Sequence, residues 1–183
     1  GNAIPLGIGR DNEMELSDKI QQGLQHDVLL LSGGVSMGEK DLVPALLHQA
    51  HVLEVFHKVQ LKPGKPLWFG QAEGRQQRTL VFGLPGNPVS SLVCYILFVA
   101  PLIRAYQQGP RGIDIQPDSC AELTAPYTLR GDRPTYHPGR LDWISGKWSV
   151  TPLPLSGSAD QQALAQANCL AFFQPPQREY DIG

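Results

Sequence analysis

The sequence DVLLLSGGVS at residues 27–36 decides the fold class that we expect for this chain. Residues 27–32 form an apolar run of strand length, which is typical of a parallel strand buried on both faces of a sheet. Gly33 and Gly34 follow, so the chain can turn sharply and present backbone N–H groups at the carboxyl end of the strand. An amphipathic helix pattern comes next, at residues 42–47. A strand, a tight loop and a helix in this order predict an α/β layer.

The same alternation extends on both sides of this stretch. Further strands are expected at residues 3–8, 52–61, 67–70 and 80–83, and helices from Asp11 or Asn12 onward and over residues 88–106. Strands that alternate with helices predict a mostly parallel sheet. We therefore expect one α/β domain over residues 1–109.

The composition changes after this domain. Residues 109–117, GPRGIDIQP, are a linker by composition. Short strand-like pieces follow at residues 120–129, 134–144, 147–153 and 169–173, with one helix expected over residues 157–167. Residues 110–183 are therefore predicted to form a small β-rich domain.

The bulk properties of the 183 residues exclude several classes of protein. A formal net charge of −2 gives no overall field that would attract nucleic acid. The three cysteines are far apart and odd in number, which is neither a disulfide framework nor a zinc-binding spacing. The sequence shows no signal peptide and no run of about 18 apolar residues. We expect a cytoplasmic protein with neither nucleic acid nor membrane as a partner.

The glycine loop after residue 32 is the first candidate binding element. Ligands of open α/β sheets bind where strands end, so the backbone of Gly33, Gly34, Val35 and Ser36 is a candidate anion cradle, although a simple tight turn has the same sequence. Asp41, like Glu39, lies near the start of the next helix. A carboxylate there either stabilises the helix dipole or holds Mg²⁺ beside a phosphate.

The turn Lys62-Pro-Gly-Lys65 is a sharper signal. Proline fixes the backbone and glycine permits a left-handed one, so a rigid turn holds two ammonium groups near each other. Two adjacent cations repel each other unless an anion lies between them. The alternative is a solvated hairpin whose lysines have no ligand. The two prolines favour the anion site.

The loop GLPGNPVS at residues 83–90 is the third candidate. It leads into the long helix, whose first amides and dipole favour an anion. Asn87 is a candidate helix cap, and Ser90 offers a hydroxyl in the first turn. No Ser-His-Asp or Cys-His arrangement suggests a nucleophilic enzyme, so electrostatic positioning of a phosphorylated, anionic ligand is the better interpretation.

These three motifs together resemble the molybdopterin molybdenumtransferase family, which includes bacterial MoeA-type proteins and the E domain of gephyrin. LLSGGVSMGEKD, FHKVQLKPGKPLWFG and VFGLPGNPVSSLVCYILFVAPLIR occur in the family's order and spacing. A looser match covers the second part of the chain. The resemblance implies an incomplete three-layer α/β/α molybdopterin-binding domain followed by a small C-terminal β domain.

The resemblance also implies a reaction and its site. Molybdate is inserted into adenylylated molybdopterin, AMP is released, and Mg²⁺ assists. The catalytic positions would be Asp41, Asp11, Lys62 and Lys65, with Asp41 also binding Mg²⁺. The molybdopterin-binding positions would be Gly33, Gly34, Val35, Ser36, Pro85, Gly86, Asn87, Pro88 and Ser90. Molybdate would contact Lys62, Lys65, Ser90, Arg133 and Ser158.

Members of this family begin with further domains, and their molybdopterin-binding domain opens with a strand that is not in this sequence. We therefore expect a fragment that is inactive alone, with an exposed sheet edge, from a full-length protein that forms a homodimer. Two other functions stay open. One is a non-catalytic molybdopterin-binding scaffold of the gephyrin type. The other is a relative that acts on a different nucleotide containing a pyrophosphate.

Overall fold

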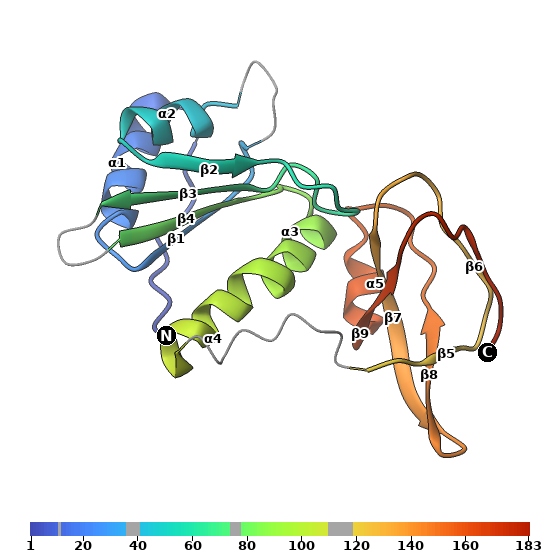
Figure 1. The fold of residues 1–183 in the computed structure, drawn as a ribbon. Coiled ribbons are helices and arrows are strands. Elements are labelled where there is room, and N and C mark those ends of the chain that lie inside the picture. The colour runs from blue at the N-terminus through green and yellow to red at the C-terminus, as the bar shows by residue number, and fades with distance from the viewer. Residues whose placement is uncertain (11, 36–40, 74–77, 110–118) are drawn as a thin grey trace.

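The computed structural model describes residues 1–10, 12–35, 41–73, 78–109 and 119–183 (Figure 1). An α/β domain comes first and a β-rich domain follows it, which confirms the predicted fold class. The long green helix of the first domain points toward the second domain, so the two domains meet at its N-terminal end (Figure 1).

The first sheet contains four strands in the order β1-β4-β3-β2. Their bounds are Val28–Ser32 (β1), Leu53–His57 (β2), Trp68–Glu73 (β3) and Arg78–Leu84 (β4). Only β1 and β4 pair in parallel, whereas β2–β3 and β3–β4 are antiparallel. The prediction of a mostly parallel sheet is therefore wrong. Neighbouring strands joined by the short connections 58–67 and 74–77 run antiparallel, because a parallel pair needs a longer crossover.

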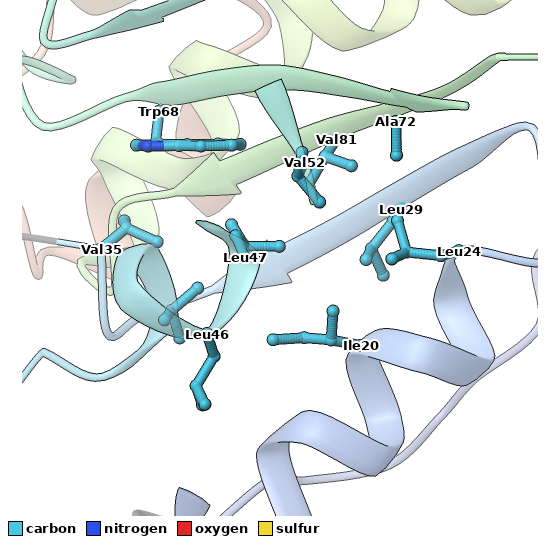
Figure 2. Packing of buried hydrophobic residues seen from close by; sticks show 11 residues of the cluster. Ile20, Leu24, Leu29, Val35, Leu46, Leu47, Val52, Trp68, Ala72 and Val81 are labelled. Atoms are coloured by element: carbon cyan, nitrogen blue, oxygen red, sulfur yellow. The ribbon is translucent and has the colours of Figure 1, made fainter. Parts of the chain in front are cut away.

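Helices cover both faces of this sheet. On one face, α1 (Glu13–Gly23) and α2 (Val43–Gln49) pack with the sheet through residues such as Ile20, Leu47 and Val81 (Figure 2). On the other face, the long helix buries Cys94 and Val99 against Phe82. The three α/β/α layers expected from the family resemblance are present.

The start of the first helix agrees with the sequence. The Asn12 side-chain oxygen accepts hydrogen bonds from Met14 N at 3.0 Å and Glu15 N at 3.2 Å. These bonds satisfy two amides that the first helical turn leaves without partners. Of the two candidate caps, Asn12 is therefore a cap in this structure, and Asp11 lies outside the described residues.

The long helix runs as α3 (Pro88–Cys94), a π-helical turn η1 (Tyr95–Val99) and α4 (Ala100–Gln108). The π turn ends two residues before Pro101, which lacks an N–H and crowds the preceding turn of a regular α-helix. By length and composition alone, residues 88–108 would also be sufficient to cross a membrane. One face of this helix packs on the sheet, and a core helix of a soluble protein passes the same test.

The strand predicted at residues 3–8 does not form. Ile4 and Ile8 are 58% and 88% exposed, and these residues pair with no described strand. A strand needs a neighbouring strand that satisfies its backbone hydrogen bonds. Instead, Lys19 Nζ donates to the Leu6 carbonyl at 2.5 Å, and Leu6 packs on the core beside α1.

The second domain is built on a four-stranded sheet in the order β5-β8-β7-β9. The bounds are Glu122–Leu123 (β5), Thr135–Ile144 (β7), Lys147–Pro152 (β8) and Cys169–Phe173 (β9). The short strands β6 (Tyr127–Thr128) and β10 (Glu179–Tyr180) pair separately, and α5 spans Gln161–Gln166. This agrees with the expected β-rich domain with one helix.

A hydrophobic cluster joins the two domains. Leu61, Val89 and Val93 of the first domain form its buried centre. Side chains of the second domain, including Tyr136 and Leu164, pack against them. Because Leu61 directly precedes Lys62 and Val89 directly precedes Ser90, this junction fixes the surroundings of the predicted anion site.

Candidate anion-binding site

The two glycine loops lie together at one edge of the first sheet. Strands β1 and β4 are parallel, so both carboxyl ends reach the same edge. Gly33 N donates to the Leu84 carbonyl at 3.0 Å, and Gly33 and Gly34 have left-handed φ values of 87° and 67°. A Cβ on Gly86 would lie 3.4 Å from the Gly33 Cα, so the two loops touch. This is the arrangement in which open α/β sheets bind ligands.

Val35 contributes to this loop with its backbone. Its side chain is buried and occupies space that Gly83 leaves free, because a Cβ at Gly83 would lie 2.6 Å from Val35 Cγ1. The Val35 carbonyl lies 2.9 Å from His57 Nε2, which holds it when that nitrogen carries the proton. His57 is not recognisable as a site residue from the sequence, because nothing in a single sequence indicates that the end of β2 reaches the glycine loop. Ser36 lies outside the described residues.

Asp41 is half-buried and lies two residues before α2 begins. Within the described ranges, no group of three or more His, Cys, Asp or Glu side chains could enclose a metal ion. Mg²⁺ in a nucleotide site keeps several waters and takes phosphate oxygens with one or two carboxylates. Asp41 fits as one such carboxylate, but it does not form a complete protein cage.

The lysine turn is closed by its own backbone. Val59 N donates to Lys65 O at 3.0 Å, and Lys58 N donates to Leu67 O at 2.8 Å. Gly64 has a φ of 123°, which only glycine adopts without strain. The predicted rigid turn therefore exists.

Cys94 of α3 lies directly beneath this turn. Its Sγ donates to the Gly64 carbonyl at 3.6 Å, and a Cβ at Gly64 would lie 2.7 Å from this sulfur. Burial raises the pKa of the Cys94 thiol to about 12, so the group stays a neutral donor. Cys94 is therefore a packed core residue.

The lysines of this loop differ in their surroundings. Lys62 Nζ donates to the Arg130 carbonyl of the second domain at 3.1 Å. Lys65 is exposed, and its ammonium group contacts no partner in the part of the chain that the structure describes. Lys58, exposed and four residues before Lys62, has a left-handed φ of 77°. Such a conformation is uncommon for a residue with a side chain and is often found at functional sites. This third lysine was not among the predicted site residues, although its spacing from Lys62 is visible in the sequence.

The second domain closes over the lysine turn. Lys62 N donates to Pro134 O at 2.9 Å, and Tyr136 N donates to Lys62 O at 2.8 Å. Arg133 Nη1 donates to the Leu61 carbonyl at 2.9 Å. The structure therefore brings Arg133 to the lysine turn, as the resemblance implied, but its described contact is with the backbone.

The loop before α5 closes over the start of α3. Asn87 Nδ2 donates to Ser158 Oγ at 2.9 Å, and Val89 N donates to the Ser158 carbonyl at 3.0 Å. The expectation that the Asn87 side chain caps α3 is wrong, because its amide binds Ser158 and the Ser158 carbonyl satisfies the helix amide instead. Pro85 is buried and Pro88 starts the helix, so this loop is stiff as predicted.

Ser90 is buried at 5% exposure in the first turn of α3. It lies one helical turn before Cys94, on the helix face that supports the lysine turn. Its hydroxyl group is therefore close to the turn that carries Lys62 and Lys65.

Asp160 stiffens the loop that carries Ser158. Its carboxylate accepts hydrogen bonds from Ser156 N at 3.0 Å, Ser156 Oγ at 2.7 Å and Ala163 N at 3.0 Å. These bonds, with the Ala163 amide first, lower the pKa of Asp160 to about 2. The same carboxylate therefore caps α5 and holds the loop that carries Ser158.

Comparisons with known proteins agree with this arrangement. Residues 2–105 match the family described as "Probable molybdopterin binding domain", and residues 120–183 match "MoeA C-terminal region (domain IV)". The molybdopterin molybdenumtransferase of Haemophilus influenzae is 43% identical over 98% of this chain and 44% of its own length. The Synechocystis enzyme of the same name is 32% identical over 94% of this chain and 40% of its own length. Gephyrin of Dictyostelium discoideum is 36% identical over 75% of this chain and 21% of its own length.

The fold is similar to a solved structure as well. The crystal structure of the molybdopterin biosynthesis moeA protein from Pyrococcus horikoshii aligns with a TM-score of 0.64 at 18% identity. The alignment covers 98% of this chain and 40% of that one. The chain thus spans about two fifths of the length of such relatives.

Proposed function

Because the chain belongs to the molybdopterin molybdenumtransferase (MoeA) family, we propose that it supplies the molybdopterin and molybdate sites of an enzyme of molybdenum cofactor biosynthesis. The full-length enzyme inserts molybdate into adenylylated molybdopterin and releases AMP. The single observation that supports this most directly is the lysine turn, packed on α3 beside the buried Ser90 and closed over by the second domain.

The lysine turn is suited to a small dianion such as molybdate. Lys65 offers a free ammonium group, and Lys62 offers a second one whose described bond is to a neutral carbonyl. Ser90 and Ser158 add hydroxyl donors on the helix side. Charge-assisted hydrogen bonds from several donors bind tetrahedral oxyanions without needing a protein metal cage.

The two glycine loops are suited to the phosphorylated pterin. Gly34, Val35 and Ser36 would offer backbone N–H groups, whereas the N–H of Gly33 binds the Leu84 carbonyl and joins this loop to residues 85–90, which would form the opposite wall. Asp41 would hold Mg²⁺ together with phosphate oxygens of the substrate, where the ion offsets negative charge as AMP leaves. The protein residues orient the two substrates, so that molybdate lies beside the dithiolene of the pterin.

The test is molybdate-dependent release of AMP from adenylylated molybdopterin by the full-length protein. Lys62→Ala and Asp41→Ala should each lower turnover by about tenfold or more, the loss expected for a charged contact. Lys147→Ala is the matched control, because this lysine pairs with Glu122 on the surface of the second domain. Normal turnover in both site variants would refute the assignment.

The gephyrin relative supports one alternative, a molybdopterin-binding scaffold without turnover. It predicts that the full-length protein binds molybdopterin in calorimetry but releases no AMP when molybdate is added. AMP release that depends on molybdate excludes it.

A further inference from the structure

We propose that His57 is a positioning residue, which fixes the glycine loop for the phosphorylated pterin by binding the carbonyl of Val35. This inference rests on the proposed function of the same site. It adds a residue at the end of β2 that contacts neither substrate and acts through the backbone of Val35.

A row of paired residues crosses the first sheet beside the glycine loop. His57 pairs with Trp68, and Trp68 pairs with Gly83, so these residues of β2, β3 and β4 lie side by side. Val35 packs at the Gly83 end of the row, because a Cβ on Gly83 would lie 2.6 Å from Val35 Cγ1. Val35 and Trp68 belong to the same buried cluster on this face of the sheet (Figure 2). The row thus places the His57 side chain within reach of the Val35 backbone.

The contact between the two residues is a hydrogen bond to a backbone oxygen. His57 Nε2 lies 2.9 Å from the Val35 carbonyl oxygen. A carbonyl oxygen can only accept, so the bond forms when Nε2 carries the proton. His57 is half-buried, and partial exclusion of water strengthens such a bond. The bond therefore sets the direction in which the Val35 carbonyl points.

Other described contacts of the glycine loop hold its place but leave this direction open. Gly33 N donates to the last carbonyl of β4 at 3.0 Å. A Cβ on Gly34 would lie 3.0 Å from Val43 Cγ2, so α2 lies against the loop. The two glycines before Val35 allow many backbone conformations, since they have no side chain. The orientation of the Val35 carbonyl therefore depends on His57.

This orientation matters to an anionic ligand. A carbonyl oxygen carries a partial negative charge, so a phosphate is repelled by a carbonyl that faces it. Bound to His57, the Val35 oxygen is held at β2 and cannot turn toward the ligand. The N–H groups of Gly34 and Val35 then remain for the phosphate of the pterin.

The lysine turn does not depend on the His57 side chain. The chain continues from His57 into this turn, where Lys58 N donates to Leu67 O at 2.8 Å and Val59 N donates to Lys65 O at 3.0 Å. These backbone bonds persist when the His57 side chain is replaced. A substitution at His57 should therefore weaken binding of the pterin and leave binding of molybdate unchanged.

The experiment measures kcat and both KM values of molybdate-dependent AMP release with the full-length protein. His57→Phe keeps a ring of similar size but has no donor. It should raise KM for adenylylated molybdopterin about fivefold, the loss expected for one hydrogen bond, while kcat and KM for molybdate stay within about twofold. His57→Gln should restore most of the loss, because its amide nitrogen reaches about as far as Nε2, whereas the shorter His57→Asn should not.

His48→Phe is the matched control. His48 is an exposed histidine near the end of α2 in the same domain. Its replacement makes the same chemical change away from the glycine loop, so both KM values should stay within about twofold of wild type. If His57→Phe does not fold, the comparison of His57→Gln with His57→Asn decides the question, since both side chains are polar amides.

Four results would overturn the proposal. An unchanged KM for adenylylated molybdopterin in the folded His57→Phe and His57→Asn variants would show that the bond does not support binding. An equal rise of both KM values would show a general structural role. A fall in kcat larger than the rise in KM would show a residue that acts on the reacting groups. Equal losses in His57→Gln and His57→Asn, or in His48→Phe, would show that the reach of the donor is irrelevant. Failure of the proposed function is distinguishable from these results, because wild type would then show no molybdate-dependent release of AMP.

Discussion

The side-chain amide of Asn87 donates a 2.9 Å hydrogen bond to the hydroxyl of Ser158, and the carbonyl of the same serine accepts the amide of Val89. One serine of the second domain therefore binds both the loop before α3 and the first turn of that helix. The site at this helix end is shared between the domains.

This relationship predicts coupled effects of Asn87→Ala and Ser158→Ala. Each change removes one hydrogen bond, so each should lower the free energy of unfolding by about 1 kcal/mol. The double variant should lose less than the sum of the two, because the second change removes a partner that is already gone. Urea unfolding of the three variants measures the coupling. Ser156→Ala offers a control on the same loop, since its hydroxyl binds Asp160 instead. If the losses of the two single variants add exactly in the double variant, the bond between Asn87 and Ser158 contributes nothing to stability.

The lysine turn predicts that Gly64→Ala is strongly disruptive. The φ of 123° disfavours alanine by about 1–2 kcal/mol, and the new Cβ would lie 2.7 Å from the sulfur of Cys94. We expect a loss of unfolding free energy of about 2 kcal/mol or more, together with weaker molybdate binding in calorimetry. Gly146→Ala is the control, because Gly146 has a φ of 84° but open space around it. Adding Cys94→Ala should restore part of the loss by making room for the methyl group.

Cys94 predicts a decrease of stability in alkali. Its folded pKa of about 12 lies above the ordinary value of 9.0, so the folded state favours the protonated thiol. This contribution is fully present below about pH 9 and is lost as the pH rises toward 12, at up to about 1.4 kcal/mol per pH unit. The difference in unfolding free energy between wild type and Cys94→Ala should shrink over this range. A difference that does not vary with pH would contradict the assignment.

The same burial predicts selective alkylation. Iodoacetamide near pH 8 should modify the exposed Cys120 in the native protein and reach Cys94 only after unfolding. Mass spectrometry of peptides from native and urea-treated protein measures the two rates. Equal native rates would show that the turn does not cover the sulfur.

The lowered pKa of Asp160 predicts that the protein loses stability in acid. Its folded pKa of about 2 lies below the ordinary 3.8, so its stabilising contribution is present above pH 3.8 and is lost as the pH falls toward 2. Asp160→Asn should keep the bond from Ala163 N, because asparagine is a good helix cap, but lose at least one bond from Ser156. Hydrogen exchange at the Ser156 amide should therefore accelerate, while exchange in α5 changes little. Unchanged exchange at Ser156 would refute this role.

Local features of the fold were predictable from the sequence. The apolar run at residues 27–32 became β1, and the residues around Asn12 and Pro88 marked helix starts. The lysine turn was predictable too, because proline and glycine restrict the backbone within a few residues. These features depend on neighbours along the chain, which a single sequence displays.

The directions of β2 and β3 were not predicted correctly, because an apolar strand pattern is the same for either direction and only the length of the connection limits it. The segment at residues 3–8 has a strand pattern but no described neighbour, so it stays unpaired. In both cases the sequence pattern describes one segment, whereas strand pairing depends on a second segment that lies elsewhere in the chain.

By itself, the sequence determined the family, the α/β and β-rich character of the two parts, and the lysine and glycine motifs of the site. Only the tertiary structure decided which groups meet. It directed the Arg133 guanidinium to the Leu61 carbonyl, Asn87 to Ser158 and His57 to Val35. The physical reason is that these hydrogen bonds join residues 22 to 72 positions apart, and such partners are set by packing of whole elements, which no local pattern contains.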